Sequence, residues 1–283
     1  MKLARYRAPS GTQCGVVIDD GVIGFPSMGL GISTLDDLMA SGDGAFDLIR
    51  KSTRERRPEH RLADIELLAP FPKPGKYLAI GMNFAKHIEE TRNLGANRTN
   101  HQLWFNKQST CINDPYGIIV AGVSKKLDYE VELGFVIGKR ARYVTRQDAL
   151  SHVFGYFVAN DVSARDWQFH SPTFTVGKSF DTHGPIGPWV VTADEIPDPQ
   201  TLQLRCLVNG EVRQDANTQD MIYPIADQIA YLSTAFTLEP GDLIATGTPE
   251  GVGMGMEPPR FLSSGDIVRC EIDGIGAIEN RVA

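Results

Sequence analysis

Short runs of β-forming residues, separated by turn residues, dominate the chain beyond residue 75 and constrain its fold more than any other feature. Only one stretch there, 222–235, has a helical stripe of apolar residues. Because strands do not alternate regularly with helices, a doubly wound parallel sheet is disfavoured. We expect an α+β, mainly β fold in which a mixed, mainly antiparallel sheet curls into a roll or barrel. The expected strands are 76–81, 117–120, 130–137, 155–159, 189–192, 202–208, 243–246 and 267–272, with a hairpin turn at Asn209-Gly210.

The first 69 residues have a different pattern. Residues 16–25 predict a β-hairpin that turns at Asp20-Gly21, and 34–40 predict a short helix with Thr34 and Asp37 spaced as a capping box. A second helix is expected around 45–51. The Pro-rich stretch 69–75 suits neither a helix nor a central strand. We therefore expect a small N-terminal α+β domain over 1–69 and a catalytic domain over 70–283.

The composition narrows the class of partner. A net charge of −7 argues against a nucleic-acid or anionic-membrane surface, since both require a basic face. The four cysteines are scattered without a C-x-x-C pair, as expected for reduced thiols in a cytoplasmic protein. The N-terminus has no apolar run typical of a signal peptide, and no stretch of 18 apolar residues predicts a membrane span.

Three acidic residues form the most informative cluster. Glu130 and Glu132 recur with period two, so in a strand they share one face, roughly 6–7 Å apart. Asp161 ends another apolar run. Carboxylate oxygens without His or Cys suit Mg²⁺, Mn²⁺ or Ca²⁺ better than zinc. Spacing alone leaves two alternatives open: an exposed strand face paired with Lys125 and Lys126, or the paired acids of a glycosidase, which we rank lower.

Six segments, in order, carry a resemblance to a known family. They are 81–87, 128–138, 160–168, 177–182, 184–188 and 239–253. With them the chain resembles the fumarylacetoacetate hydrolase family over about residues 77–276. The resemblance implies a β-roll catalytic domain, a small N-terminal domain, a homodimer, and a divalent metal, commonly Mg²⁺, on Glu130, Glu132 and Asp161. Implied reactions include acylpyruvate and diketo-acid hydrolysis, oxaloacetate decarboxylation, and isomerisation or hydration of unsaturated oxo acids.

His87 and Glu90 are candidates for the catalytic base. They are three residues apart and would be neighbours on a helical turn, where the carboxylate would orient the imidazole and raise its basicity. A lone His is more often structural, but the resemblance implies this His-Glu dyad. The polar stretch Thr91 to Gln102 has little to bury and is expected to form a mobile lid.

Four more residues are candidates for the substrate. Arg165 and Gln168 follow Asp161 at spacings of four and three, which predicts one shared helical face. Lys178 can hold a carboxylate or stabilise an oxyanion. The resemblance implies that the Gly-rich loop around Thr248 approaches the substrate carboxylate, which glycines permit. The loop lacks the Gly-Lys-Ser/Thr ending of a nucleotide site.

These residues, together with what the resemblance implies, predict a Mg²⁺-dependent hydrolase that cleaves a C–C bond of a 2,4-diketo acid. The substrate would be an acylpyruvate or a 2,4-diketo-3-deoxy sugar acid, such as the one from L-rhamnose. The polar residues of the expected lid, including Asn93, Asn97 and Arg98, slightly favour a hydroxylated substrate, because an apolar acyl group would leave them unpaired. An oxaloacetate-type decarboxylase and an isomerase or hydratase of unsaturated oxo acids stay as alternatives, as does a binding protein without chemistry.

Overall fold

The computed structural model describes residues 1–92 and 100–283, in which a twelve-stranded mixed sheet forms the centre of the molecule. Its main path runs β4-β3-β2-β1-β13-β11-β10-β16-β6-β7, while β5 pairs with β1 and β8 with β13. The strands are β1 Lys2–Ala8, β2 Gly11–Ile18, β3 Gly21–Gly24, β4 His60–Arg61, β5 Glu66–Leu68, β6 Tyr77–Gly81, β7 Leu103–Lys107, β8 Ile112–Asn113, β10 Val131–Ile137, β11 Val153–Asn160, β13 Gly184–Thr192 and β16 Leu243–Ala245.

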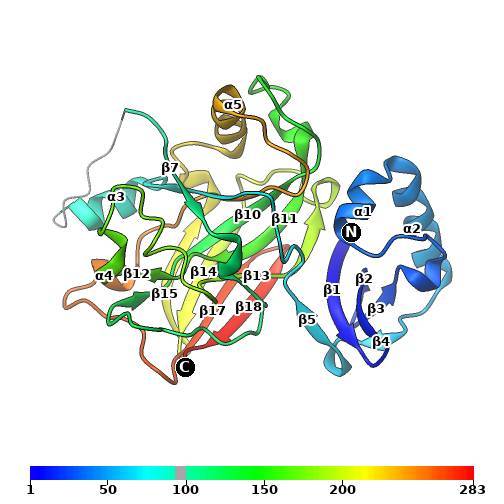
Figure 1. Ribbon diagram of the computed structural model, residues 1–283, viewed down its shortest axis with the longest axis horizontal. Helices are drawn as coiled ribbons and strands as arrows, with labels where there is room; N and C mark the ends of the chain where they lie inside the picture. Colours follow the sequence, from blue (N-terminus) through cyan, green and yellow to red (C-terminus); the bar gives the residue numbers. More distant parts are fainter. Residues whose placement is uncertain (93–99) are drawn as a thin grey trace.

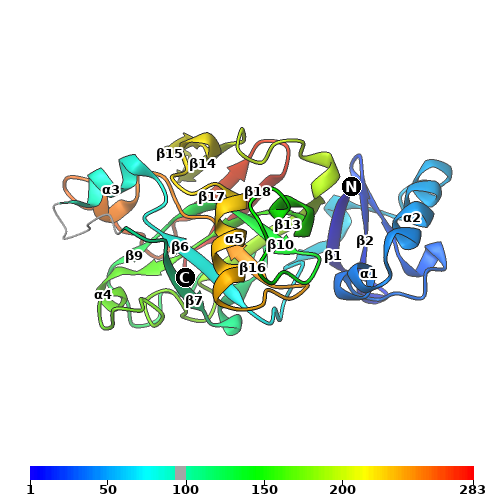
Figure 2. The ribbon, with the colours of Figure 1, turned by 90° about the horizontal axis from the view of Figure 1, so that it is seen from above.

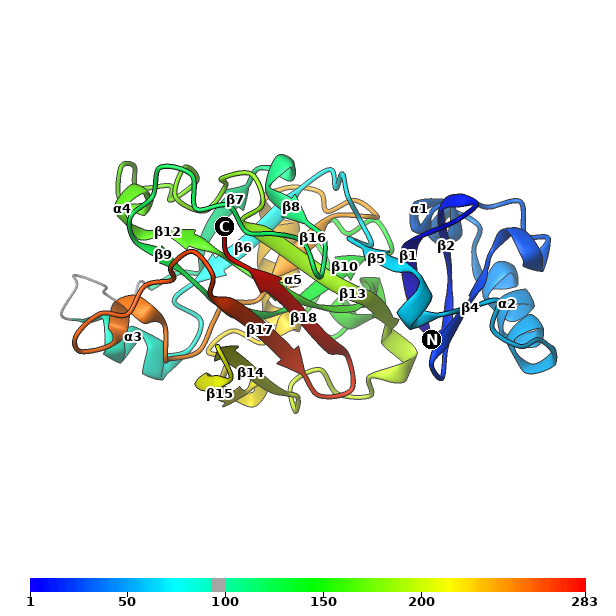
Figure 3. The ribbon, with the colours of Figure 1, turned by 90° about the horizontal axis from the view of Figure 1, so that it is seen from below.

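Two smaller sheets complete the β structure. An antiparallel sheet of order β15-β14-β17-β18 lies below the large sheet (Figure 3), and β9 pairs with β12. Their bounds are β9 Leu127–Asp128, β12 Ser163–Ala164, β14 Gln203–Val208, β15 Glu211–Asn217, β17 Ile267–Ile272 and β18 Gly276–Arg281. Among the named strands of the described residues, two pairs are parallel: β16 with β6, and β13 with β8. The other pairs are antiparallel. The expected mainly β, mixed sheet is therefore confirmed.

Helices are few and short. They are α1 Leu35–Ala40, α2 Asp43–Glu55, α3 Ala85–Thr91, α4 Arg165–Gln168 and α5 Ile225–Ala235, with 3-10 turns η1 Pro26–Met28, η2 Leu62–Asp64, η4 Ser109–Cys111, η5 Ala149–His152, η6 Ala193–Glu195, η7 Thr218–Asp220 and η8 Gly253–Gly255. The capping box at α1 is confirmed, since Asp37 N donates to Thr34 Oγ1 and Thr34 N donates to Asp37 Oδ2, both at 3.0 Å. Both expected hairpins are present, β2–β3 and β14–β15.

Two sequence predictions need correction. Residues 117–120 form only a single parallel bridge, Ile119↔Val282, and no strand. Side chains bond the backbone on either side of it: Asn113 Nδ2 donates to Ile118 O at 2.9 Å, and Val120 N donates to Thr182 Oγ1 at 2.9 Å. The helix expected from residue 222 begins only at Ile225. The backbone of Ile222 is instead bonded to Asn83, with Ile222 N donating to Asn83 O at 2.7 Å.

The N-terminal residues extend the large sheet. β1 pairs with β13 through Lys2↔Val191 and Leu3↔Val190. The β1–β3 hairpins with α1 and α2 stand at one end of the molecule, while α3 and α4 lie at the other end (Figure 1, Figure 2). The division of the chain at residue 69 stays a prediction.

Burial explains where the functional side chains can point. All seven residues of β10 are buried. Val131, Leu133, Phe135 and Ile137 face one apolar core, which also contains residues of β14, β17 and α5, while Val136 faces the second core. Glu132 shares the face of Val136, because side chains alternate along a strand. All four cysteines are buried and free of disulfides, and Cys270 Sγ lies 3.9 Å from Cys206 Sγ. No helix within residues 1–92 and 100–283 is long and apolar enough to cross a membrane.

Candidate metal and substrate site

The three predicted metal ligands meet where β10 begins and β11 ends. Val131 pairs with Asn160 across the two strands, and Asp161 N donates to Glu130 O at 2.9 Å. One oxygen each from Glu130, Glu132 and Asp161 lies within 4.8 Å of the others. All three residues are at most 4% exposed. The alternative of an exposed acidic face paired with Lys125 and Lys126 is therefore wrong.

Buried lysines neutralise two of these carboxylates. Lys178 Nζ lies 2.6 Å from Glu130 Oε2 and 2.8 Å from Asp161 Oδ2, and Lys107 Nζ lies 2.5 Å from Asp161 Oδ1. Burial alone would raise the pKa of Glu130, but the charges of Lys178 and Arg165 outweigh it and hold this pKa at about 2. Glu130 is therefore a carboxylate at neutral pH.

Glu132 is the carboxylate that lacks a counter-charge. Gly247 N donates to its Oε2 at 2.8 Å, but within the described residues no ammonium or guanidinium lies within ion-pair distance of it. Burial, together with the nearby charges of Asp161 and Glu130, raises its pKa well above the usual range. A hard divalent cation among these oxygens would remove that conflict, and an all-carboxylate donor set suits Mg²⁺, Mn²⁺ or Ca²⁺. The residues present thus fit such an ion.

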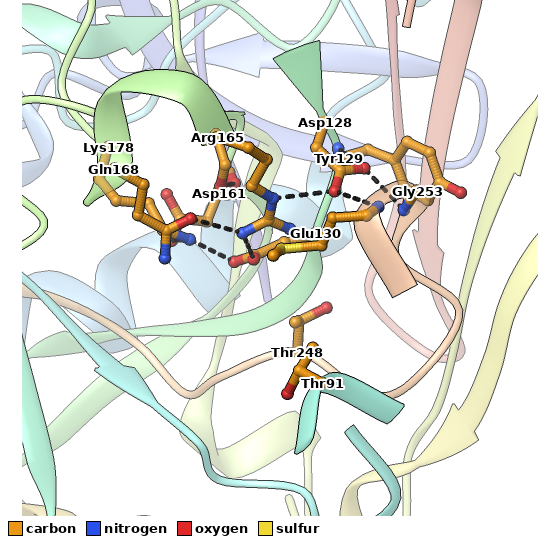
Figure 4. Close-up of polar contacts among 12 residues, drawn as sticks. Thr91, Asp128, Tyr129, Glu130, Asp161, Arg165, Gln168, Lys178, Thr248 and Gly253 are labelled. Carbon is orange, nitrogen blue, oxygen red and sulfur yellow. Dashed lines mark hydrogen bonds and ion pairs between the residues drawn. The ribbon is translucent and has the colours of Figure 1, made fainter. Parts of the chain in front are cut away.

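Arg165 and Gln168 lie beside Glu130 of this triad (Figure 4). Arg165 Nε donates to Asp128 Oδ2 at 2.8 Å, and its Nη1 lies 2.7 Å from Glu130 Oε1 and 2.9 Å from Gln168 Oε1. Its Nη2 is buried and has no hydrogen-bond partner among the described residues. A buried donor without a partner is costly, which makes Nη2 a group that a bound anion could satisfy.

The shared helical face expected for Asp161, Arg165 and Gln168 is only partly present. α4 begins at Arg165, and the residues before it are extended because Ser163 pairs with Asp128 and Ala164 with Leu127. Arg165 and Gln168 do touch on α4. Asp161 reaches the same site from the end of β11, through the sheet register rather than through a helix.

The His87–Glu90 pair forms as expected on α3. His87 Nδ1 lies 3.2 Å from Glu90 Oε2, and Glu90 Oε1 accepts a hydrogen bond from Gly251 N at 2.9 Å. A proton on Nδ1 would satisfy Glu90 and leave Nε2 free to accept one. Gly255 permits this arrangement, because a Cβ there would lie 2.3 Å from Glu90 Cδ.

Thr248 is held within the protein. Its hydroxyl donates to Val131 O at 3.0 Å and accepts from Gln214 Nε2 at 2.8 Å. The hydroxyl proton of Thr248 is therefore already donated to Val131 O. A contact between Thr248 and the substrate carboxylate stays a prediction. The preceding residue, Gly247, has a φ of +92°, and a Cβ there would lie 2.8 Å from Asn83 Cβ. Glycine is required at this position.

A single cavity of about 380 Å³ brings most of the predicted residues together. It is lined by His87, Glu130, Glu132, Arg165, Gln168, Lys178 and Thr248. Two other predicted residues contact this lining: Glu90 contacts His87, and Asp161 contacts Lys178. Residues 93–99 of the expected lid lie outside the described residues, so the lid stays a prediction.

Sequence reasoning missed several groups that support the site. Lys107 is fully buried and also donates to Lys178 O and, at 3.1 Å, to His183 O. Asp128 accepts from Gly253 N at 2.8 Å and Met254 N at 3.0 Å, besides Arg165. Lys107 shares a strand face with the buried Phe105, two residues before it, and this alternation was the available signal for Lys107.

The chain is similar to known proteins over its whole length. The family model described as fumarylacetoacetate hydrolase C-terminal matches residues 76–283. The mitochondrial oxaloacetate tautomerase FAHD2A of Bos taurus is 39% identical over 290 residues, which cover 100% of this chain and 91% of that protein.

The fold is also similar to solved structures. The fumarylacetoacetate hydrolase of Exiguobacterium antarcticum is 34% identical with a TM-score of 0.83, over 100% of this chain and 99% of that one. The maleylpyruvate hydrolase of Sphingobium sp. SYK-6, in complex with manganese(II) and pyruvate, is 32% identical with a TM-score of 0.81, over the same shares.

Proposed function

The chain belongs to the fumarylacetoacetate hydrolase family, and from this we propose that it hydrolyses a C–C bond of a 2,4-diketo acid. The products would be a 2-oxo acid and a carboxylic acid. Its relatives are named as hydrolases, isomerases and oxaloacetate tautomerases. These three reaction types are therefore the candidates for this chain. The observation that carries the narrower proposal is the His87–Glu90 dyad, which shares one cavity with the acidic triad.

Divalent-metal binding is supported by the buried triad and by the manganese in the related maleylpyruvate hydrolase. We propose Mg²⁺ on Glu130, Glu132 and Asp161. When bound, such an ion supplies Lewis acidity to the oxygens of a 2-oxo acid. Arg165 Nη2, the buried donor without a partner, is proposed to bind the substrate carboxylate, and Lys178 to stabilise negative charge on the 2-oxo oxygen.

His87 is proposed to move the protons. Its Nε2 takes a proton from water, and Glu90 stabilises the resulting imidazolium through Nδ1. The hydroxide adds to the C4 carbonyl carbon, the C3–C4 bond breaks, and its electron pair passes to C3. His87 then returns the proton to C3, which yields the 2-oxo acid and the carboxylic acid. Gln168 holds Arg165 in position through its 2.9 Å hydrogen bond.

The described part of the cavity favours an acylpyruvate over a sugar-derived diketo acid. Its lining includes the apolar side chains of Ile80, Met82, Leu103, Phe105 and Met254. Hydroxyl groups against such a surface would lose hydrogen bonds to water without replacement. Asn93, Asn97 and Arg98, on which the lean towards a hydroxylated substrate depends, lie outside the described residues.

A second candidate is tautomerisation of oxaloacetate, which the name of the bovine relative favours. The same His87 could carry a proton between C3 and the enol oxygen without any attack by water. Decarboxylation and the isomerase or hydratase reactions stay as weaker alternatives, because no separate feature of the site favours them.

A substrate panel with Mg²⁺ tests these proposals. Acetylpyruvate, a sugar-derived diketo acid and oxaloacetate are compared, with pyruvate release measured for the first two and keto–enol exchange for the last. We expect the largest kcat/KM for the acylpyruvate. Rapid oxaloacetate exchange without hydrolysis of any diketo acid would replace the hydrolase proposal with the tautomerase.

Two further expectations stay proposals. We propose that the protein is a homodimer, which light scattering would test. We also propose a cytoplasmic location. The bovine relative is named as mitochondrial, so fractionation of the source cells is the deciding measurement.

A further inference from the structure

Three phenylalanines form an aromatic wall along the cavity. Phe105 lies on β7, Phe169 follows α4, and Phe174 lies in the loop beyond it. The rings of Phe105 and Phe174 have centroids 6.1 Å apart at 73°, and those of Phe169 and Phe174 are 5.9 Å apart at 84°. These edge-to-face contacts join the three rings into one continuous surface, and all three residues line the cavity.

The aromatic wall runs from the charged site to solvent. At its inner end Phe105 is 6% exposed, and Lys178 Nζ lies 5.3 Å from the centre of its ring. At its outer end Phe169 is 60% exposed. The wall therefore begins beside the group proposed to bind the 2-oxo acid and ends at the mouth of the cavity.

Two residues that line the cavity have an unusual backbone conformation. Six non-glycine residues in the described chain have positive φ, and two of them, Met82 at 57° and Phe174 at 59°, line the cavity. Of the other four, Asp19 and Asn209 are residue types that tolerate such values in hairpin turns, while Tyr143 and Thr182 lie outside the cavity. Phe and Met do not tolerate such values, and strain of this kind concentrates at functional sites. The backbone at Phe174 is strained in the conformation that places its ring in the wall.

We propose that the aromatic wall of Phe105, Phe169 and Phe174 binds the C4 substituent of the substrate and selects an aromatic or large apolar acyl group. The inference rests on the proposed function, since the 2-oxo acid end must lie beside Lys178. The cavity of about 380 Å³ is larger than pyruvate requires and lies within the range of pockets for larger ligands. A tail laid on the wall would cover the exposed ring of Phe169.

The charges of the described lining residues disfavour a second carboxylate on the tail. The two ammonium or guanidinium groups among its described lining residues, Arg165 and Lys178, both already contact carboxylates. A carboxylate against the aromatic wall would lose its hydration without a cation to replace it. Dicarboxylic substrates should therefore bind less well than apolar ones.

Binding of three 2-oxo acids to the Mg²⁺-loaded full chain tests the inference by calorimetry. 4-Phenyl-2-oxobutanoate, 2-oxobutanoate and 2-oxoglutarate share one head group and differ in the tail. They lack the 4-oxo group, so binding is measured without hydrolysis. We expect the phenyl compound to bind at least about 10-fold more tightly than 2-oxobutanoate.

Variants locate the preference. Phe169→Ala removes an exposed ring, and Phe174→Gly removes the middle ring at a backbone conformation that glycine adopts without strain. Both should lose most of the phenyl preference. The matched control is Phe236→Ala, which removes a 38% exposed ring outside this cavity and should keep the preference.

The outcomes separate this inference from the proposed function. Equal or tighter binding of 2-oxoglutarate than of the phenyl compound, or an unchanged preference in both wall variants, would overturn the inference. Hydrolysis of benzoylpyruvate and acetylpyruvate is measured separately. If neither is hydrolysed, the proposed hydrolase is wrong, while the binding ratios still decide whether the wall selects the tail.

Discussion

Replacing Gly255 with alanine should disable the His87–Glu90 dyad while leaving the protein folded. A Cβ at residue 255 would lie 2.3 Å from Glu90 Cδ and 2.6 Å from its Oε1. Ordinary van der Waals contact begins at 3.4 Å, so Glu90 must retreat by about 1 Å, the difference between these distances. That movement would break its contacts with His87 Nδ1 and Gly251 N, which are 3.2 and 2.9 Å long.

The expected effect is large on activity and small on stability. Misplacement by about 1 Å in a catalytic group can cost about 10²-fold in rate. Gly255 has no positive φ, so alanine can adopt its backbone, and the obstructed atoms belong to the end of a flexible side chain. The free energy of unfolding should therefore fall only by about 1–2 kcal/mol, the net worth of the two hydrogen bonds of Glu90 that are lost.

The assay compares pyruvate release from an acylpyruvate with thermal unfolding of the same preparations. Gly44→Ala is the control, because a Cβ at residue 44 meets nothing within 4 Å. Glu90→Gln should lose activity to a similar extent, and adding Gly255→Ala to it should cost little more, since both act on one group. A Gly255→Ala enzyme that is folded and within about 3-fold of wild-type activity would refute this reasoning, because a loss near 10²-fold is expected.

Three more predictions follow from the same site. Glu130→Gln or Asp161→Asn should abolish activity with the fold intact, and EDTA should inactivate the enzyme until Mg²⁺ or Mn²⁺ is added; full activity in chelated protein would contradict the metal site. His87→Ala should lower diketo-acid hydrolysis by about 10²–10⁴-fold but spare more of any oxaloacetate decarboxylation, which needs no attacking water; equal losses would contradict that role. In metal-free protein, burial and the neighbouring acids raise the pKa of Glu132 in the folded state. Its protonated form therefore stabilises the folded state at low pH, and this stabilisation is lost as the pH rises through the raised pKa. Glu132→Gln should therefore stabilise the metal-free protein more at pH 8 than at pH 5 in urea unfolding, and an equal effect at both would count against this.

Much of the β structure could be predicted, since it depends on local patterns. The alternation in 130–137 and the turn at Asn209-Gly210 correspond to β10 and the β14–β15 hairpin. The error at 117–120 has a tertiary cause, because only Ile119 pairs with another strand segment, in a single bridge to Val282, while Asn113 and Thr182 side chains bond the backbone on either side of it. A residue 62 positions away cannot be recognised as a partner from local sequence.

The sequence by itself determined that Glu130 and Glu132 share a face, because the period of a strand is set by its covalent geometry. It also determined that His87 and Glu90 are neighbours, because one helical turn separates them. Only the tertiary structure decided which distant groups complete the site. Lys107 neutralises Asp161 across 54 positions, and Gly251 holds Glu90 across 161. Such contacts depend on strand register and loop packing, which bury charges that must then find partners wherever the fold provides them.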